Sequence, residues 1–315
     1  MQSQQITKTL TFSAAIALSA ATGLGFFGSL CWVFGLLDHL RPYYVLGLVV
    51  VGIVLLWQRS RWGWLLILPL AINLFLLAPL FMPAQTQPAP AFTITHINLD
   101  KDKVAGLEYA ARSGSDIVLL QELTPALAGM LTTTLPAYAL VLAHPLWNTH
   151  GSALLVRREG AVRVAKAEII HLPATAERPL ISAEILVDQT HIQLLSLHTT
   201  RVRNAATAAG QAAEFTAVAN WSSDLVKIGQ PVLIIGDFNT TPWSRQMHRL
   251  LSNGQLQNGM NHHGWQPSFP TQLPVFLQIP IDLLVHSEQL RVTNLQTSPN
   301  LGSDHRGLSV GVGFH

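Results

Sequence analysis

Hydrophobic residues follow two different patterns along the chain, and the change between them falls near residue 90. Asp, Glu, Lys and Arg are absent from Thr9 to Leu37, from Pro42 to Gln58 and from Trp62 to Leu99. About 20 apolar residues in a helix cross a hydrocarbon core of about 30 Å. The pattern therefore predicts a transmembrane anchor over residues 1–82, with about three helices at about residues 10–37, 43–58 and 62–82.

Two of the three apolar segments have alternative interpretations. The second segment is short compared with the lower limit of about 17 residues for a span, so a short interfacial or re-entrant helix is its alternative. The first segment follows Lys8 and contains small residues such as Ala20 and Ala21, as a cleaved signal peptide would. Its uncharged run is longer than a usual signal region and two more apolar segments follow, which favours an anchor.

Basic residues beside the apolar segments predict the orientation of the anchor. Lys8, Arg59 and Arg61 flank the membrane on the expected cytoplasmic side, whereas residues 38–41 mix acidic and basic side chains. Three crossings then place residue 83 onward outside, which for a bacterial inner-membrane protein is the periplasm. If the second segment does not cross, the orientation reverses.

A different pattern begins after an uncharged, Pro- and Gln-rich segment, residues 83–90, which is typical of a linker. Beyond it, short β-branched runs predict strands, and Ala, Leu and Glu at helical spacing predict helices. The expected strands are Phe92–Ile97, Asp116–Gln121, Ser152–Val156, Leu180–Val187, His191–Leu197, Val232–Ile235 and Ile281–Val285. The expected helices are Lys103–Ser113, Thr124–Thr134, Asn204–Lys227 and about Ser244–Leu251.

Strands outnumber helices too strongly for the two to alternate regularly. This balance favours an α/β (α+β) domain over residues 91–315, a sandwich of two β-sheets with helices covering the outside. A simple doubly wound sheet is the alternative.

The charge balance of this domain argues against nonspecific binding of long nucleic acids. Beyond residue 90 there are 15 Lys and Arg against 16 Asp and Glu, so the overall charge of +2 comes from the anchor. Nonspecific nucleic-acid binding draws much of its affinity from phosphate neutralisation by a basic surface. The only cysteine, Cys31, lies in the first apolar segment, so the chain forms no intrachain disulfide.

Several predicted strands run into a polar side chain that can bind a metal ion or move a proton. They are followed by Asn98, by Glu122, by His198, and by Asp237 together with Asn239. Strand ends in one sheet system can share a rim, and loops at such rims present reactive groups on a rigid scaffold. Singly, Asp237 with Asn239 also fits an Asx-turn and Glu122 a helix cap, but together the positions favour one site.

Asp282 is the most unusual of the candidate residues because it lies inside an apolar strand, next to Ile281 and Leu283. A carboxylate in such a place is costly unless it has a charged or hydrogen-bonding partner. His305, at the end of the Gly302-Ser-Asp-His305 motif, is a suitable partner.

Taken together, these residues resemble the endonuclease/exonuclease/phosphatase (deoxyribonuclease I-like) superfamily, which includes deoxyribonuclease-like nucleases, apurinic-site endonucleases, neutral sphingomyelinases and inositol-polyphosphate phosphatases. The resemblance covers residues 91–315 and rests on motifs in the family's order: Asn98, Leu120-Gln-Glu122, His198, Gly236-Asp-Phe-Asn239, Ile281-Asp282 and Ser303-Asp-His305. It implies a four-layer αββα sandwich, two stacked β-sheets flanked by helices, which agrees with the independent strand count.

The resemblance also implies a metal site and a cofactor, Mg²⁺ or Mn²⁺. Glu122 would hold the ion, assisted by Asn98 and by Asp304 through water. Hard divalent cations prefer such oxygen ligands and keep several waters, which leaves room for a substrate phosphate.

The resemblance further implies catalytic roles for five residues. Asp282 would orient His305, which would act as general base or hold a phosphate oxygen, while Asp237 and Asn239 would position the nucleophile and the phosphoryl oxygens. His198 would contact the phosphoryl group or protonate the leaving oxygen. A histidine there resembles the deoxyribonuclease and sphingomyelinase branches, but the acid that pairs with it in deoxyribonuclease-like members is not identifiable in the sequence.

The function expected from this reasoning is hydrolysis of a phosphodiester or phosphomonoester by a membrane-anchored, metal-dependent phosphoesterase. Tethering makes a lipid-linked substrate attractive, and Arg178, Arg201 and His150 are weaker candidates for the substrate groove. The alternatives are an extracytoplasmic nuclease acting on DNA or RNA and a catalytically inactive, membrane-tethered binding module. No protein partner is evident from the sequence.

Overall fold

The computed structural model describes residues 2–83 and 88–315, and the chain divides into two units. One unit comprises Met1–Met82 together with Trp243–Arg245, and the other comprises Pro83–Pro242 and Gln246–His315. The main division therefore falls where the hydrophobic pattern changes.

The first unit is helical. Its elements are α1 (Gln2–Leu24), η1 (Gly25–Phe27), α2 (Trp32–Leu37), η2 (Asp38–Leu40), α3 (Arg41–Trp57), η3 (Arg61–Leu66) and α4 (Ile67–Phe81). Among the described residues, three helical stretches are long and apolar enough to cross a membrane, by length and composition: Gln5–Phe27, Trp32–Trp57 and Arg61–Phe81.

The first two stretches have different limits from those expected, 10–37 and 43–58. The first ends at Phe27, and the chain restarts as a helix at Trp32, after Cys31 has adopted an extended conformation with φ −146° and ψ 124°. Glycine has a low helix propensity, and Gly23, Gly25 and Gly28 all lie close to this break. The second stretch consequently has 26 residues, well above the minimum for a span.

Buried polar side chains connect the three helical stretches. Arg41 Nη1 donates a hydrogen bond to Asn73 Oδ1 over 3.0 Å, and Asn73 Nδ2 donates to Thr22 Oγ1 over 2.8 Å. Arg41 also forms an ion pair with Asp38. Buried hydrogen bonds of this kind stabilise the packing of helices against one another.

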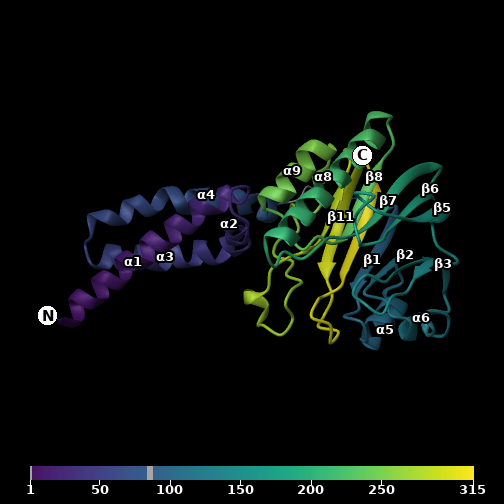
Figure 1. The fold of residues 1–315 in the computed structure, drawn as a ribbon, viewed down its shortest axis with the longest axis horizontal. Helices are drawn as coiled ribbons and strands as arrows, with labels where there is room; N and C mark the ends of the chain where they lie inside the picture. The colour runs from purple at the N-terminus through teal and green to yellow at the C-terminus, as the bar shows by residue number, and fades with distance from the viewer. Residues whose placement is uncertain (1, 84–87) are drawn as a thin grey trace. The chain divides into compact units, whose positions relative to one another are not determined.

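The second unit contains two six-stranded mixed β-sheets (Figure 1). The first has the order β11-β12-β1-β2-β4-β3, with β11 (Leu290–Thr297), β12 (Leu308–Phe314), β1 (Phe92–Asn98), β2 (Ile117–Gln121), β4 (Ser152–Arg157) and β3 (Tyr138–His144). The second has the order β5-β6-β7-β8-β10-β9, with β5 (Arg163–Ile170), β6 (Leu180–Val187), β7 (Thr190–His198), β8 (Val232–Asp237), β10 (Asp282–His286) and β9 (Gln257–Asn258).

Helices flank both sheets, so the predicted fold of two sheets covered by helices is confirmed. The first sheet packs against α5 (Val104–Ser113), α6 (Pro125–Ala128) and α7 (Leu131–Thr134) through a core that includes Leu107, Leu120 and Leu131. On the second sheet, α8 (Ala205–Lys227) contacts β8, and its Phe215 packs against Phe238, the residue after β8. The next helix along the chain is α9 (Arg245–Gly254). A short η4 turn, Val275–Leu277, lies in the loop before β10.

The strand register explains how residues far apart in sequence reach one rim. β1 and β2 are parallel neighbours that end at Asn98 and Gln121, and β7 and β8 are parallel neighbours that end at His198 and Asp237. β10 runs antiparallel to β8, so that its first residue, Asp282, lies opposite Asp237. The polar side chains that follow these strands therefore emerge at the carboxyl ends of both parallel pairs.

Candidate active site

Asp237 and Asp282 form the acidic centre of the site. Both are buried, with 2% and 0% of their surface exposed. Asp237 also begins a tight turn, in which Asn239 N donates to Asp237 Oδ1 over 2.8 Å and Asn239 Nδ2 donates to Asp237 Oδ2 over 3.1 Å. The Asx-turn considered for this motif is therefore present, and it fixes the orientation of the Asp237 carboxylate.

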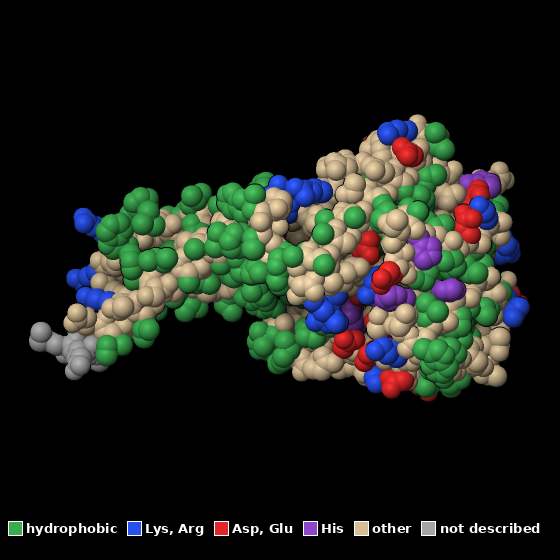
Figure 2. All heavy atoms as spheres, viewed as in Figure 1, with side chains coloured by type: hydrophobic (Ala, Val, Ile, Leu, Met, Phe, Trp, Pro, Cys, Tyr) green, Lys and Arg blue, Asp and Glu red, His purple; other side chains and the backbone are tan. Residues whose placement is uncertain are grey.

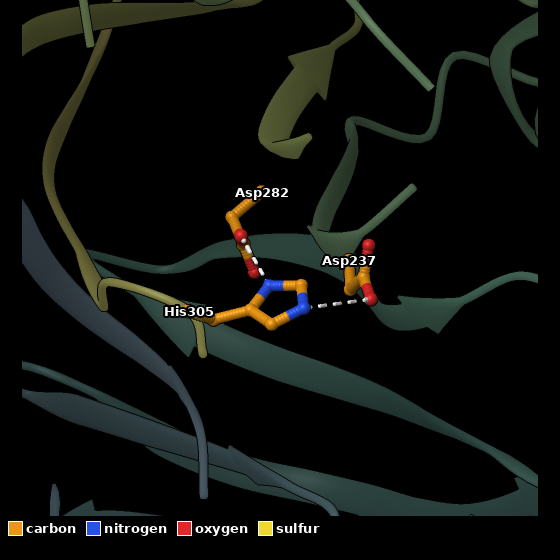
Figure 3. Close-up of side chains that lie close together, drawn as sticks. All are labelled: Asp237, Asp282 and His305. Atoms are coloured by element: carbon orange, nitrogen blue, oxygen red, sulfur yellow. Dashed lines mark hydrogen bonds and ion pairs between the residues drawn. The ribbon is translucent and has the colours of Figure 1, made fainter. Parts of the chain in front are cut away.

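His305 joins the two carboxylates, as Figure 3 shows. Its Nδ1 donates to Asp282 Oδ2 over 2.8 Å, and its Nε2 lies 3.8 Å from Asp237 Oδ2. The ring of Phe269 packs on the imidazole with centroids 4.8 Å apart. His305 comes from the loop before β12, so the pairing connects the first sheet to the second.

The environment of this trio separates the pKa values of its members. Burial raises the pKa of Asp237 to about 7, although attraction to His305 opposes this rise. Burial alone would lower the pKa of His305, but Asp282 and Asp237 outweigh it and raise that pKa to about 10. Burial likewise opposes ionisation of Asp282, yet His305 and its hydrogen bond hold the Asp282 pKa below the usual value. At neutral pH His305 is therefore an imidazolium held by an ionised Asp282.

His198 lies on the other side of Asp237, with its Nε2 3.6 Å from Asp237 Oδ2. Arg178 Nη1 is 3.0 Å from the same nitrogen and donates a hydrogen bond to it. Burial and then the charge of Arg178 lower the pKa of His198 well below its usual value. His198 is thus a neutral imidazole. Apart from Asp237, no acidic side chain among the described residues lies within ion-pair distance of it.

Glu122 follows β2 in a left-handed conformation with φ +56°, and its Oε1 accepts a hydrogen bond from Asn98 Nδ2 over 3.3 Å. Burial raises the Glu122 pKa, and the nearby charges of Asp304 and Asp100 raise it further, while the Asn98 bond and His305 lower it. Asp304 Oδ1 also lies 4.0 Å from His305 Nε2. Glu122, Asp304 and Asp100 thus form an acidic group next to the His305 trio.

This acidic group fits a hard divalent cation. Burial and then the charges of Asp304 and Asp100 raise the pKa of Glu122, and burial and then the charge of Asp304 raise the pKa of Asp100. Oxygen ligands of this type and number are those that Mg²⁺ binds, and a cation would relieve the mutual repulsion.

A second set of ligand-type atoms lies in Asp237, Asp282 and His305, all within 4.8 Å of one another. Both Asp282 oxygens in that set already accept hydrogen bonds from imidazole nitrogens. Because the trio is buried and both Asp282 oxygens are already hydrogen-bonded, the acidic group around Glu122 is the better candidate for a metal site.

The weaker candidates lie at the edge of the site. Arg178 is the closest, through its bond to His198. The charge of Arg178 also contributes to the lowered pKa of His150, after burial. Arg201 is exposed and stacks over Phe269, with its guanidinium 4.9 Å from the ring centroid. His150 and Arg201 therefore belong to the surroundings, whereas Arg178 contacts the site directly.

His96, which was not predicted from the sequence, lies in the middle of β1 and is fully buried. Its Nε2 donates to Asp282 Oδ1 over 3.1 Å, so that Asp282 accepts hydrogen bonds from two imidazoles. The other ring nitrogen, Nδ1, is buried and has no hydrogen-bond partner among the described residues. The available signal was a histidine inside an otherwise apolar strand, which needs a partner as Asp282 does.

The sequence indicated Gln121 only as part of the Leu120-Gln-Glu122 motif. In the structure its side chain connects the two sheets next to the site. Its Nε2 donates to the Leu197 carbonyl over 2.8 Å, and its Oε1 accepts from Asp237 N over 3.3 Å. Gly236 allows this close approach, because a Cβ at that residue would lie 2.0 Å from the Leu197 oxygen and 2.7 Å from Gln121 Nε2.

Comparison with known proteins agrees with the fold. A model of the Endonuclease/Exonuclease/phosphatase family matches residues 98–305. A search of curated proteins found no match. Solved structures with a similar fold include a mannosyl-6-phosphatase from Bacteroides thetaiotaomicron, with 16% identity, a TM-score of 0.56, and 71% of this chain and 100% of that chain covered.

Two further similar structures extend the comparison. TDP2 from D. rerio, complexed with single strand DNA product, has 18% identity and a TM-score of 0.53, with 70% of this chain and 98% of that chain covered. A functionally unknown conserved protein from Enterococcus faecalis has 15% identity and a TM-score of 0.57, with 71% and 100% covered. At such low identity these likenesses establish the fold alone.

Proposed function

Because the chain belongs to the endonuclease/exonuclease/phosphatase family, we propose that it is a divalent-metal-dependent hydrolase of phosphate esters. The observation that carries the proposal is the buried Asp237–His305–Asp282 network beside the acidic group around Glu122. An imidazolium, an arginine and a carboxylate with a pKa near neutrality can assist an attack of water on a phosphoryl centre.

Glu122, Asp304 and Asn98 would hold the cation, Mg²⁺ or Mn²⁺. When bound, the ion supplies neutralisation of negative charge on the phosphoryl group. Proton transfer and the contacts with the phosphoryl oxygens would be made by other side chains.

Asp237 is the better candidate for the general base. With a pKa of about 7 it is substantially ionised at neutral pH, whereas His305, with a pKa of about 10, already holds its proton. A new bond forms between the water oxygen and phosphorus, and the water proton passes to Asp237. The bond to the leaving oxygen breaks with its electron pair on that oxygen, which then takes a proton from solvent. His305 then serves as a hydrogen-bond donor to a phosphoryl oxygen, which is the second of the two roles expected for it.

Arg178 and His198 would contact the phosphoryl group from the other side of Asp237. The guanidinium donates to the neutral imidazole, which leaves Arg178 as the positive charge on this side. His198 is therefore a poor proton donor for the leaving oxygen in the free enzyme, and a role in holding Arg178 and the substrate suits it better. Asn239 would keep the Asp237 carboxylate in position.

We further propose that the three apolar stretches anchor the enzyme in a bilayer, with the hydrolase domain in the periplasm of a bacterial inner membrane. The length and composition of the helices support anchoring, and the positions of Lys8, Arg59 and Arg61 support this orientation. A tethered enzyme meets membrane lipids at high local concentration, so we propose a phosphate ester carried by a lipid as the substrate class.

The function can be tested with the full-length chain in detergent micelles. Turnover of bis(p-nitrophenyl) phosphate and of p-nitrophenyl phosphate is measured with Mg²⁺, with Mn²⁺ and with a chelator. Metal-dependent turnover that Asp237→Ala and His305→Ala each abolish, with folding retained, is the expected result. Unchanged rates in either variant contradict the assignment of the site. Absence of turnover with nucleotide, lipid and inositol phosphates as well favours a binding module.

A nuclease remains the competing enzyme. The lack of a basic excess in the domain disfavours it, since 15 Lys and Arg accompany 16 Asp and Glu beyond residue 90. Degradation of DNA or RNA by the same preparation, faster than hydrolysis of lipid-derived esters and abolished by Asp237→Ala, would favour this alternative.

A further inference from the structure

Exposed hydrophobic side chains are concentrated in one loop of the second unit. From residue 92 to 315 the large exposed hydrophobic side chains are Met130, Leu140, Trp147, Ile228, Leu273, Val275, Phe276 and Leu277. Half of them lie in the six-residue segment Gln272–Leu277, here called the rim loop, where Phe276 is 70% exposed. Single exposed apolar residues are ordinary, but a contiguous group marks an interaction surface.

The rim loop is attached directly to the candidate active site. It lies between two buried residues, Thr271 and Gln278, that both contact the His305 loop. Thr271 N donates to the Asp304 carbonyl over 3.0 Å, and Arg306 Nε donates to Gln278 Oε1 over 2.9 Å. The loop therefore lies at the edge of the site and not on a remote face.

Hydrogen bonds keep the rim loop in shape with its apolar side chains outward. Phe269 and Ile279 pair as a bridge at its base, Gln278 Nε2 donates to the Leu273 carbonyl over 2.7 Å, and Leu277 N donates to the Pro274 carbonyl over 2.8 Å. Figure 1 draws the segment as a yellow-green loop, and Figure 2 shows hydrophobic side chains in its place, near acidic, basic and histidine side chains. Such prior ordering reduces the entropy lost when a partner binds.

A second exposed aromatic residue, Trp147, belongs to the same rim. Its loop connects β3 to β4, and Ser152 at the start of β4 lies opposite Gln121, the residue before Glu122. The side chain is 79% exposed. Tryptophan is the residue type most typical of the interface between bilayer and water.

Three observations favour a lipid bilayer as the partner of this exposed apolar surface. The segment Pro270–Pro280 contains no charged residue. The chain has three stretches suited to a bilayer, the last ending at Phe81. From Met82 to Phe92 the chain can extend at most about 35 Å, which is less than the diameter of about 45 Å expected for a domain of this size. A bilayer that holds the helices is thus always within reach of the domain.

We infer that the rim loop and Trp147 contact the lipid bilayer and hold the mouth of the active site at the membrane surface. This inference rests on the proposed function, because it names the substrate class as phosphate esters carried by membrane lipids. Phe276, Leu277 and Trp147 enter the interfacial layer, while the charged groups of the site remain among the lipid headgroups.

The test uses the full-length chain in lipid nanodiscs, with Cys31→Ser to remove the single cysteine. A nitroxide label is attached at Phe276→Cys and, as the matched control, at Ile228→Cys. Ile228 is 78% exposed and lies beyond the carboxyl end of α8, whereas Gln211, nearer the amino end, donates a hydrogen bond to the Asn239 carbonyl. Electron paramagnetic resonance then measures collisions with oxygen, which enters lipid, and with a polar nickel chelate, which does not.

The expected result is a ratio of oxygen to nickel collisions that is several-fold higher at residue 276 than at residue 228. This contrast should disappear when the protein is held in an amphipol without a bilayer. Equal ratios at the two residues in nanodiscs overturn the inference, and so does exclusion of both reagents from residue 276, because that result indicates a protein contact.

Turnover of bis(p-nitrophenyl) phosphate and of p-nitrophenyl phosphate by the same labelled preparations separates the two proposals. Turnover without lipid contact refutes only the present inference. Lipid contact without turnover leaves the docking surface established and refutes the proposed hydrolase.

Discussion

The Nδ1 atom of His305 donates a hydrogen bond to Asp282 Oδ2 over 2.8 Å, between a loop of one sheet and a strand of the other. The pair leaves Nε2 of the same ring facing Asp237 at 3.8 Å. Asp282 thereby fixes the orientation of the His305 ring, and Nε2 points toward the site.

The rate of ester hydrolysis should have a bell-shaped dependence on pH. As the base, Asp237 must be ionised, so kcat/KM should rise through pH about 7, and it should fall near pH about 10 as His305 loses its proton. Binding of the cation should move the acidic limb to lower pH, because a positive charge favours ionised carboxylates. A pH profile with a chromogenic diester at two metal concentrations measures both effects, and a flat profile from pH 6 to pH 11 contradicts the assignment.

Replacement of Asp237 by asparagine should stabilise the folded protein at alkaline pH while it abolishes activity. The pKa of Asp237 is raised in the folded state, so its contribution to stability falls as pH rises from about 4 to about 7. Above that range the variant should gain about 1–2 kcal/mol, since the lost attraction to His305 offsets part of the relief. Thermal unfolding in detergent at pH 5 and pH 8 measures the gain, and equal effects at both pH values exclude this cause.

His96 should act as a positioning residue for Asp282. Its removal in His96→Phe leaves Asp282 Oδ1 buried without its donor, which costs about 1–3 kcal/mol, and it frees the carboxylate to rotate away from His305. We expect kcat to fall about tenfold or more with little change in KM, and His96→Asn to recover part of the loss. His286→Asn, at another buried histidine of 5% exposure, is the control. Equal losses of kcat in the control indicate a general packing effect.

Glu122 should determine the affinity for the cation. In Glu122→Gln the acidic group loses one charge, so the apparent Kd for Mg²⁺ should rise about tenfold or more. Thermal unfolding measures metal binding without depending on activity. Mg²⁺ should raise the unfolding temperature of the wild type, and it should affect the variant only at higher concentration. Glu108→Gln, at an exposed acid on α5, is the control. Identical shifts in all three proteins place the ion elsewhere.

The sequence carried enough information for the fold class because its central strands are buried on both faces. The predicted strands Asp116–Gln121 and Val232–Ile235 are almost wholly apolar, and they overlap the observed β2, Ile117–Gln121, and β8, Val232–Asp237. The edge strands were missed for the opposite reason. β5 is mostly exposed or half-buried, and β11 mixes polar and apolar residues around a bulge, so neither has the continuous apolar pattern.

The limits of the site prediction have a similar cause. Residues directly after strands were recognisable, and the register brings Asp237, Asp282, His198 and His305 together. His96 and Gln121 act across the gap between the sheets, and no pattern within one strand indicates which residue of the other sheet lies opposite. The protonation of His198 and His305 likewise depends on burial and on neighbours that only the packed structure supplies.

The position of β12 between β11 and β1 has a consequence for biosynthesis. Phe92 at the start of β1 pairs with Val312 of β12, so the centre of this sheet is completed by residues synthesised more than 200 positions later. Contacts so distant in sequence form late in folding. A nascent chain on the ribosome would therefore lack the Asp282–His305 pair until the segment around His305 and β12 had emerged.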